Sequence, residues 1–327
     1  MCSTSTGNKN TQDKIDDGIY PFYVRSQTVE RINSWTFDGE AILTAGDGVG
    51  VGKVFHHTYG KIGVHQRVYI LSNFKCDANY LFHFFSSHFY NRVKRMSAKN
   101  SVDSVRKEMI TEMPLYLPSK QEQAKIGVLL SLLDERISTQ NKVIDKLQSL
   151  IKGIAHKISK QGKPNIRLSE SLECSSTTLQ ESDVAEVGAY PVYGANGIVG
   201  YLDTYSTTKE AIYIIKDGSG VGSVSYVKGK CSATGTLNIL QAKEGYSLRY
   251  LYFMLKVFNF EPYKTGMAIP HIYFKDYRKA KIYCPNYELQ NKCANLLYEI
   301  EQKATIEQKI LDNLCSQKQY LLRQMFI

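Results

Sequence analysis

The chain has 327 residues, a length that suggests two globular domains. Its 41 Lys and Arg residues outnumber its 31 Asp and Glu residues, and the resulting net charge of +10 favours a polyanionic partner. No apolar run is long enough to cross a membrane, and no secretory leader is expected. The seven cysteines form no CxxC pair, which indicates reduced thiols in a cytoplasmic protein rather than a structural zinc site.

Residues 1–118 form the first predicted globular region. Residues 1–17 are polar and are expected to be loop. Around residues 18–32, 40–57 and 66–73, short runs rich in β-branched and aromatic residues alternate with Gly and Asp turns, so these runs predict strands. Residues 80–96 predict a helix with an aromatic face.

Residues 119–160 predict one long helix, which starts after Pro118 and carries Glu122 in its first turn. Seam residues recur alternately four and three positions apart, as in a coiled coil, and Gln140 is the polar one. The seam consists of Ile126, Leu130, Leu133, Ile137, Gln140, Ile144, Leu147, Ile151, Ile154 and Ile158. Roughly 40 helical residues make a rod about 60 Å long.

The second half of the chain repeats this plan, with a globular region at residues 161–285 and a long helix at residues 286–327. The turn Asp47–Gly52 (DGVGVG) recurs 170 positions later as Asp217–Gly222 (DGSGVG). The helix recurs at a spacing of 167, which makes Glu307 the counterpart of Gln140. Chance would not match the starts, phases and polar breaks of two helices, so the chain is an internal duplication.

The two copies differ at their beginnings. The second has a lead-in segment, residues 165–173, that the first lacks. Cys174-Ser-Ser-Thr-Thr corresponds loosely to the sequence Cys2-Ser-Thr-Ser-Thr. The first copy is therefore expected to begin partway into its domain.

The glycine-rich turn at residues 47–54 is not a phosphate-binding loop. A P-loop needs Gly where Asp47 stands and Ser or Thr where Val54 stands. Because the second copy keeps the glycines without a following Lys, a tight β-turn with positive φ is the better interpretation. His83 and His88 are expected to fill the core or surface rather than bind metal. No sequence motif of a catalytic centre occurs.

This order of globule, helix, globule and helix resembles the specificity (S) subunit of type I restriction–modification systems. The resemblance is carried by Tyr190–Tyr201 (YPVYGANGIVGY), Asp217–Gly222, Thr265–His271 (TGMAIPH) and the Pro-x-x-x-x-Gln starts of both long helices. The family implies an α+β fold. Two tandem target recognition domains, each a mixed β-sheet globule with short helices, would be separated by two long helices that pair as an antiparallel coiled coil.

The family also implies a non-catalytic role. Such a subunit reads the two halves of a split double-stranded DNA sequence and docks two adenine methyltransferase (M) subunits, with restriction (R) motor subunits further out. S-adenosylmethionine, ATP and Mg would bind those partners, and this chain would bind no cofactor. The alternative function is a truncated or regulatory coiled-coil scaffold that binds partner subunits without productive DNA recognition. A salt-dependent gel shift with the methyltransferase present separates the two.

Several residues are candidates for contact with DNA. The segment after the second tyrosine of each copy differs, with Arg25, Ser26 and Gln27 in one and Asn196 and Gly197 in the other. Arg pairs well with guanine, and Asn or Gln with adenine, although Asn196-Gly197 also suits a plain hairpin turn. The remaining candidates are a basic group near the end of the first region, its counterpart in the second, and a lysine after each glycine turn: Arg92, Lys94, Arg95 and Lys99; Lys264, Thr265 and His271; Lys53 and Lys228. For these, a solvated surface position is the alternative to a phosphate contact.

Gln140 and Glu307 are expected to fix the register of the helix pair. Each lies close to the midpoint of its rod, so antiparallel pairing about a pseudo-two-fold axis would bring the two side chains together. A polar pair in an apolar seam costs stability but penalises any slip. Combining Gln140→Leu with Glu307→Leu should give a more stable rod with a looser register.

Overall fold

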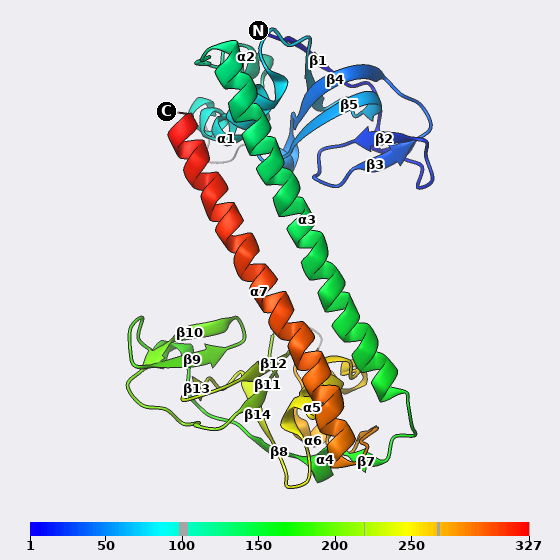
Figure 1. The fold of residues 1–327 in the computed structure, drawn as a ribbon, viewed down its shortest axis with the longest axis vertical. Helices are drawn as coiled ribbons and strands as arrows, with labels where there is room; N and C mark the ends of the chain where they lie inside the picture. The colour runs from blue at the N-terminus through cyan, green and yellow to red at the C-terminus, as the bar shows by residue number, and fades with distance from the viewer. Residues whose placement is uncertain (98–103, 219, 267–268, 327) are drawn as a thin grey trace. The chain divides into compact units, whose positions relative to one another are not determined.

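A computed structural model of the chain describes residues 1–97, 104–218, 220–266 and 269–326. The chain divides into two compact units, one formed by Met1–Gln140 with Ile310–Ile327 and the other by Asn141–Lys309. Both contain mixed sheets and helices (Figure 1), which confirms the predicted α+β class. Within the described residues, no helix is both long and apolar enough to span a membrane.

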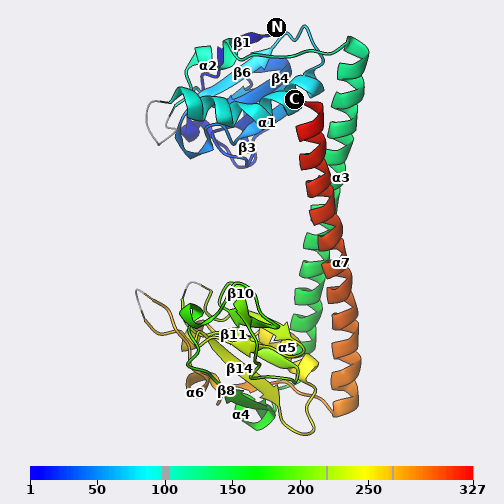
Figure 2. The same ribbon diagram turned by 90° about the vertical axis from the view of Figure 1, so that its left-hand side faces the viewer.

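The first unit is built on a six-stranded sheet in the order β1-β6-β4-β5-β2-β3. Its strands are β1 (Ser3–Thr6), β2 (Tyr20–Tyr23), β3 (Glu30–Ile32), β4 (Phe37–Ala45), β5 (Phe55–Val64) and β6 (Val68–Ser72). All neighbours are antiparallel except β2 and β5. Helix α1 (Ala78–Met96) lies across the sheet (Figure 2), and its Leu81, Phe85 and Phe89 pack with Ile42 and Leu71. Helix α2 (Lys107–Thr111) completes this core.

Strand β1 corrects the prediction that residues 1–17 are loop. Residues Ser3–Thr6 pair with β6, from Ser3 opposite Ser72 to Thr6 opposite Tyr69. Ser and Thr at an edge need no buried apolar side chain, because the ladder of backbone hydrogen bonds fixes the strand. The alternation of apolar and polar residues that marks a half-buried strand is therefore missing from the sequence.

The second unit repeats the strand order of the first, with one break. Its sheets run β12-β11-β14-β8 and β10-β9-β13, so the counterpart of β5 is divided into β12 and β13. The strands are β7 (Ile166–Arg167), β8 (Leu172–Ser175), β9 (Tyr190–Gly194), β10 (Gly197–Leu202), β11 (Ala211–Ile215), β12 (Val224–Val227), β13 (Ser232–Ala233), β14 (Leu237–Ala242) and β15 (Lys281–Ile282), with β15 paired to β7. The short helices are α4 (Leu168–Ser171), α5 (Leu248–Lys256) and α6 (Phe274–Tyr277).

Strand register shows which positions of the copies are equivalent. Ile42 lies opposite Leu71, and Ile212, 170 positions later, lies opposite Leu240. Thr4 then lies opposite Leu71, and Cys174 opposite Leu240. Thr4 is thus the counterpart of Cys174, and the match of Cys174 to Cys2 expected from sequence is wrong by two residues.

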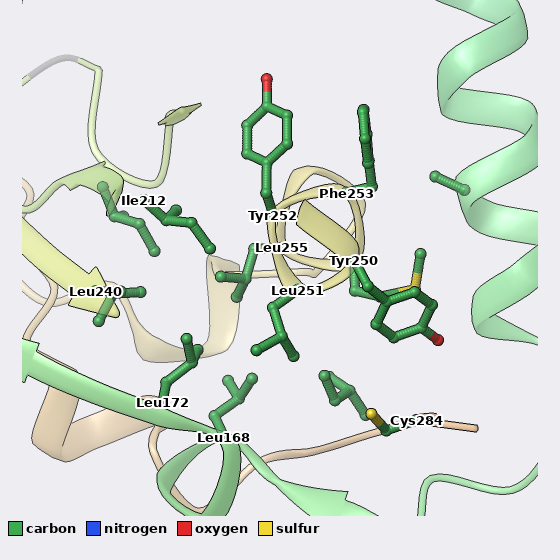
Figure 3. Packing of buried hydrophobic residues seen from close by; sticks show 14 of the residues in the cluster. Leu168, Leu172, Ile212, Leu240, Tyr250, Leu251, Tyr252, Phe253, Leu255 and Cys284 are labelled. Carbon is green, nitrogen blue, oxygen red and sulfur yellow. The ribbon is translucent and has the colours of Figure 1, made fainter. Parts of the chain in front are cut away.

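The core of the second unit forms around α5. Tyr250, Leu251 and Leu255 of this helix are buried with Ile212 and Leu240 of the sheet. Figure 3 shows Leu168 and Leu172, from the lead-in segment, pointing toward Leu251.

The long helices are α3 (Lys120–Ser159) and α7 (Tyr287–Met325), and each unit contains part of both. In the first unit they run antiparallel, because Asp134 of α3 pairs with Lys318 while the earlier Leu130 shares a cluster with Phe326. In the second unit, Ile158 near the end of α3 shares a core with Leu297 near the start of α7. Gln140 belongs to the first unit and Glu307 to the second, and their contact stays a prediction.

A buried glutamine joins each domain helix to the start of the long helix that follows it. Gln123 Oε1 accepts a hydrogen bond from the Asp77 amide at 3.1 Å, and its Nε2 donates to the Pro118 carbonyl at 2.8 Å. Gln290 makes the same two bonds, to the Ser247 amide at 2.9 Å and the Pro285 carbonyl at 2.9 Å. Asp77 and Ser247 are the N-cap residues of α1 and α5.

A tyrosine adds a second tie in each copy. Tyr80 Oη donates to the Tyr116 carbonyl at 2.9 Å, and Tyr250 Oη donates to the Tyr283 carbonyl at 2.9 Å. The carbonyls lie in the segments that lead into α3 and α7. Both domains are therefore attached to their long helices by the same three hydrogen bonds.

His83 links α1 to the helix pair of the first unit. Its side chain is buried, with Nε2 lying 3.4 Å from Ser131 Oγ and Nδ1 lying 3.8 Å from the Asp134 carboxylate, which also pairs with Lys318. Burial lowers the pKa of His83 to about 4, although the Asp134 charge acts in the opposite direction. The imidazole is therefore neutral near pH 7.

The glutamine clamp gives a prediction for stability. Gln290→Ala should lower the free energy of unfolding by about 1–3 kcal/mol, because the buried Ser247 amide loses its partner. Urea unfolding followed by circular dichroism would measure the loss. Gln302→Ala, at an exposed position of α7, is the control and should change stability by less than about 0.5 kcal/mol. Equal effects of the two substitutions would contradict the clamp.

The buried imidazole gives a prediction for pH. The folded pKa of His83 lies below that of an unfolded histidine, so between about pH 6.5 and pH 4 the unfolded chain binds the extra proton. Stability should therefore fall as the pH is lowered through this window, by on the order of 2–3 kcal/mol. His83→Gln should flatten the pH dependence of the urea midpoint, whereas His156→Gln, at an exposed position of α3, should not.

Candidate nucleic-acid interface

The glycine turns occupy equivalent positions at the ends of β4 and β11. Gly48 and Gly52 have φ of +74° and +66°, and their counterparts Gly218 and Gly222 have +98° and +90°, which confirms the predicted positive-φ turn. A Cβ on Gly52 would lie 2.8 Å from the ring of Tyr90, so the turn also needs glycine for space. Ser219, inside the second turn, lies outside the described residues.

Asp47 anchors the first turn through two arginines. Its carboxylate accepts a hydrogen bond from Arg25 Nη1 at 2.8 Å and another from Arg67 Nη1. Burial opposes ionisation of Asp47, but the hydrogen bonds from Arg67 and Arg25 outweigh it and hold the pKa of the carboxyl below its usual range. Arg25, a predicted base-reading residue, thus also positions the turn, and its side chain remains 42% exposed.

Each turn is attached to the segment that follows the domain helix. Asp47 bridges to Ser104, and the Val105 amide donates to the Gly46 carbonyl at 2.7 Å. In the second copy, Asp217 bridges to His271 and the Ile272 amide donates to the Lys216 carbonyl at 2.8 Å. The structure therefore brings the predicted residue His271 to the glycine turn.

Thr265 is tied to His271 by reciprocal backbone hydrogen bonds of 2.9 and 2.8 Å, so both lie on one small loop. Positions 267 and 268 of the TGMAIPH segment lie outside the described residues. Lys264 forms an ion pair with Glu261 at 2.6 Å on the same loop. The predicted contacts of all three residues with DNA remain predictions.

Two hairpins present the segments that differ between the copies. In β2–β3, Tyr20 lies opposite Ile32, and in β9–β10, Tyr190 lies opposite Leu202, so the strands match at a spacing of 170. Arg25, Ser26 and Gln27 occupy the loop of the first hairpin and are exposed. In the second, Gly194 pairs with Gly197, which leaves a two-residue loop of Ala195 and Asn196.

Asn196 is exposed at the tip of its hairpin, and Gly197 follows with φ of +98°. The turn interpretation of this pair is therefore correct as far as the backbone is concerned. The exposed carboxamide of Asn196 takes no part in the pairing of the two strands. Base reading by Asn196 therefore stays a prediction that is compatible with its role in the turn.

The basic group on α1 divides into two kinds of residue. Arg92 donates from Nε to the Met109 carbonyl at 2.7 Å and from Nη2 to the Glu112 carbonyl at 2.8 Å, so it holds the end of α2. Lys94 and Arg95 are exposed in the last turn of α1. Lys99 lies outside the described residues.

The two lysines predicted to follow the glycine turns are not equivalent. Lys53 follows the first turn directly, and its Nζ lies 5.7 Å from the centroid of the Tyr90 ring. Lys228 follows β12, so a whole strand separates it from the second turn, and its Nζ donates to Tyr298 Oη of α7 at 3.0 Å. The sequence suggested similar places because it does not show where β12 begins and ends.

A pair of cation–π contacts was missed from the sequence. Lys61 lies 5.1 Å above the ring of Trp35 in the first copy, and Lys230 lies 4.8 Å above the ring of Tyr205 in the second. Trp35 is 46% exposed and Tyr205 40%. The lysines are 169 positions apart and the aromatic residues 170, so the spacing of the duplication was the signal that could have found them.

Most of the chain matches a known protein family in sequence. The family model described as "Type I restriction modification DNA specificity domain" matches residues 2–149 and 166–315. The type I restriction enzyme EcoDI specificity subunit of Escherichia coli is 27% identical over 152 residues, which are 46% of this chain and 33% of that protein. A Mycoplasma genitalium protein named as a type I specificity subunit is 24% identical over 259 residues, 72% of this chain and 67% of that protein.

Solved structures agree on the fold. The S subunit of a type I restriction–modification system from M. genitalium superposes with a TM-score of 0.77 at 18% identity, covering 100% of this chain and 94% of that chain. The alignment with the E. coli relative thus spans about a third of that protein's length, while the structural alignment covers both chains almost completely.

Proposed function

Since the chain belongs to the type I restriction–modification DNA specificity family, we propose that it reads a split double-stranded DNA sequence and docks the methyltransferase and restriction subunits. The observation that supports this best is the duplication itself. Two domains share strand order, register and glycine turns, yet their hairpin tips carry Arg25-Ser26-Gln27 in one copy and Ala195-Asn196-Gly197 in the other. A common scaffold with unlike tips suits a common task on unlike half-sites.

The cation–π pairs suit a contact with the DNA backbone. Lys61 and Lys230 each hold a positive charge over an exposed aromatic ring, at equivalent places in the two domains. The ring orders the lysine without neutralising it, so the charge stays available to a phosphate. These lysines would position the domains and leave sequence reading to the hairpin tips.

The long helices offer places for partner subunits. Leu129 of α3 and Leu296 of α7 are 167 positions apart, and they are 45% and 50% exposed. Equivalent exposed leucines on duplicated helices suit two copies of one partner, in keeping with two methyltransferase subunits. In this proposal S-adenosylmethionine, ATP and Mg bind the partner subunits.

Reconstitution tests the function. The purified chain with S-adenosylmethionine and DNA should give no methylated product until a cognate methyltransferase subunit is added, and sequencing of the methylated DNA should then show a two-part motif. In the scaffold alternative, the chain would bind the methyltransferase without a DNA shift that weakens with salt. Methylation by the chain alone would overturn the proposal.

Replacement of one hairpin tip should alter one half of that motif. Asn196→Ala should weaken or relax a single half-site, since a good bidentate contact is worth about 1–3 kcal/mol of discrimination. The other half-site, read by the first domain, serves as an internal control. An unchanged motif would leave Asn196 with its turn role alone.

The two lysines should act on affinity rather than on sequence. The double variant Lys61→Gln with Lys230→Gln should bind cognate and unrelated DNA more weakly by a similar factor. It should also reduce the slope of log K against log salt by about two, one for each phosphate contact. Lys142→Gln with Lys146→Gln, exposed on α3, is the matched control. A changed motif in the Lys61 and Lys230 variant would contradict a positioning role.

A further inference from the structure

The tip of the first glycine turn presents a valine to solvent. Val49 lies in the middle of the short 3-10 helix Gly48–Gly50, and it is 97% exposed, while the neighbouring Val51 is buried at 2%. The side chain of Val49 therefore contributes almost nothing to the packing of its own domain. Single exposed apolar residues are common on protein surfaces, so the significance of Val49 depends on the turn that carries it.

The backbone of this turn is held in one conformation. The Val51 amide donates to the Gly48 carbonyl at 3.1 Å and closes the tip. A Cβ on Gly50 would lie 2.4 Å from the carbonyl oxygen of Arg25, so the loop of the β2–β3 hairpin lies directly against the turn. A contact made by Val49 on so fixed a backbone would cost little conformational entropy on binding.

Cationic side chains flank the valine. Arg25 and Arg67 both pair with Asp47, two residues before Val49, and their side chains remain 42% and 60% exposed. Lys53 is exposed at the other end of the turn. Three cations against one carboxylate leave the turn with a net positive charge. A DNA backbone attracted to these cations would bring base edges within reach of the tip.

The two glycine turns differ in sequence at the position of this valine and at no other. Asp47–Gly52 reads DGVGVG and Asp217–Gly222 reads DGSGVG, so Val49 in the first copy corresponds to Ser219 in the second. Serine can form hydrogen bonds with base edges, whereas valine can offer only an apolar contact. A tip that changes while the rest of the turn is retained suits the reading of unlike base pairs.

Building on the proposed function, we propose that Val49 is a specificity-determining residue, which contacts the 5-methyl group of one thymine in the half-site read by the first domain. Valine has no side-chain donor or acceptor, and the thymine methyl is the apolar group that an A·T pair presents in the major groove. The contact favours an A·T pair at one position and adds to any hydrogen bonds made by the neighbouring hairpin loop.

Deoxyuridine, which lacks only the 5-methyl group of thymidine, tests the contact. The full chain is reconstituted with its methyltransferase subunits, and each thymine of the methylated motif is replaced in turn. At one thymine of one half-site, replacement should weaken binding at constant salt by about fourfold, the effect of one lost methyl contact. Val49→Ala should weaken binding to the unmodified DNA by a similar factor, and deoxyuridine at that thymine should then have no further effect.

The exposed Val187 of the second unit provides the matched control, since Val187→Ala should keep the thymine preference at that position. Both variants should melt at the temperature of the unsubstituted chain, because both side chains are exposed. The inference alone is overturned if the Val49→Ala complex keeps its two-part motif and every thymine preference, or if the motif holds no thymine. An unsubstituted complex that gives no two-part motif overturns the proposed function, and this inference with it.

Discussion

A carboxamide held between two backbone groups is the interaction on which each half of the molecule depends. Gln123 and Gln290 each accept from the N-cap amide of a domain helix and donate to the proline carbonyl before a long helix. Both side chains are buried, at 4% and 2% exposed, so water cannot replace either bond. The amide has one donor and one acceptor end, which fixes the angle between the two elements as well as their distance.

The rest of each domain can then vary without disturbing this joint. The strands keep their order and register across the duplication, although few side chains are identical. The backbones of the two copies differ in the loops of the β2–β3 and β9–β10 hairpins and in the division of β5 into β12 and β13. Core packing tolerates substitution when volume and pattern are kept, whereas a surface that reads a ligand must change to read another.

The long helices and the glycine turns could be predicted from the sequence because each rests on a local signal, whereas the α+β class was implied by the family resemblance. A heptad seam, a proline start and paired glycines at constant spacing need no knowledge of the tertiary structure. Strand β1 was missed because its polar residues are held by pairing with β6, a contact across some 65 residues of chain. The lysine–aromatic pairs were missed for the same reason, since Lys61 meets Trp35 only through the register of β4 and β5. The residues assigned to DNA contact remain predictions, because the packing of the protein alone does not show what an exposed side chain binds.

The polar side chains that attach each domain make hydrogen bonds chiefly to backbone atoms, and this makes the domains easier to exchange during evolution. A proline carbonyl, a tyrosine carbonyl and an N-cap amide are present whatever side chains surround them. A foreign domain that ends in a similar helix and is followed by Pro-x-x-x-x-Gln would therefore meet the same bonding partners. Recombination between genes, with crossovers in the long helices, could exchange one half of the chain for another in a single event. The exchanged domain would then form the same hydrogen bonds to its long helix.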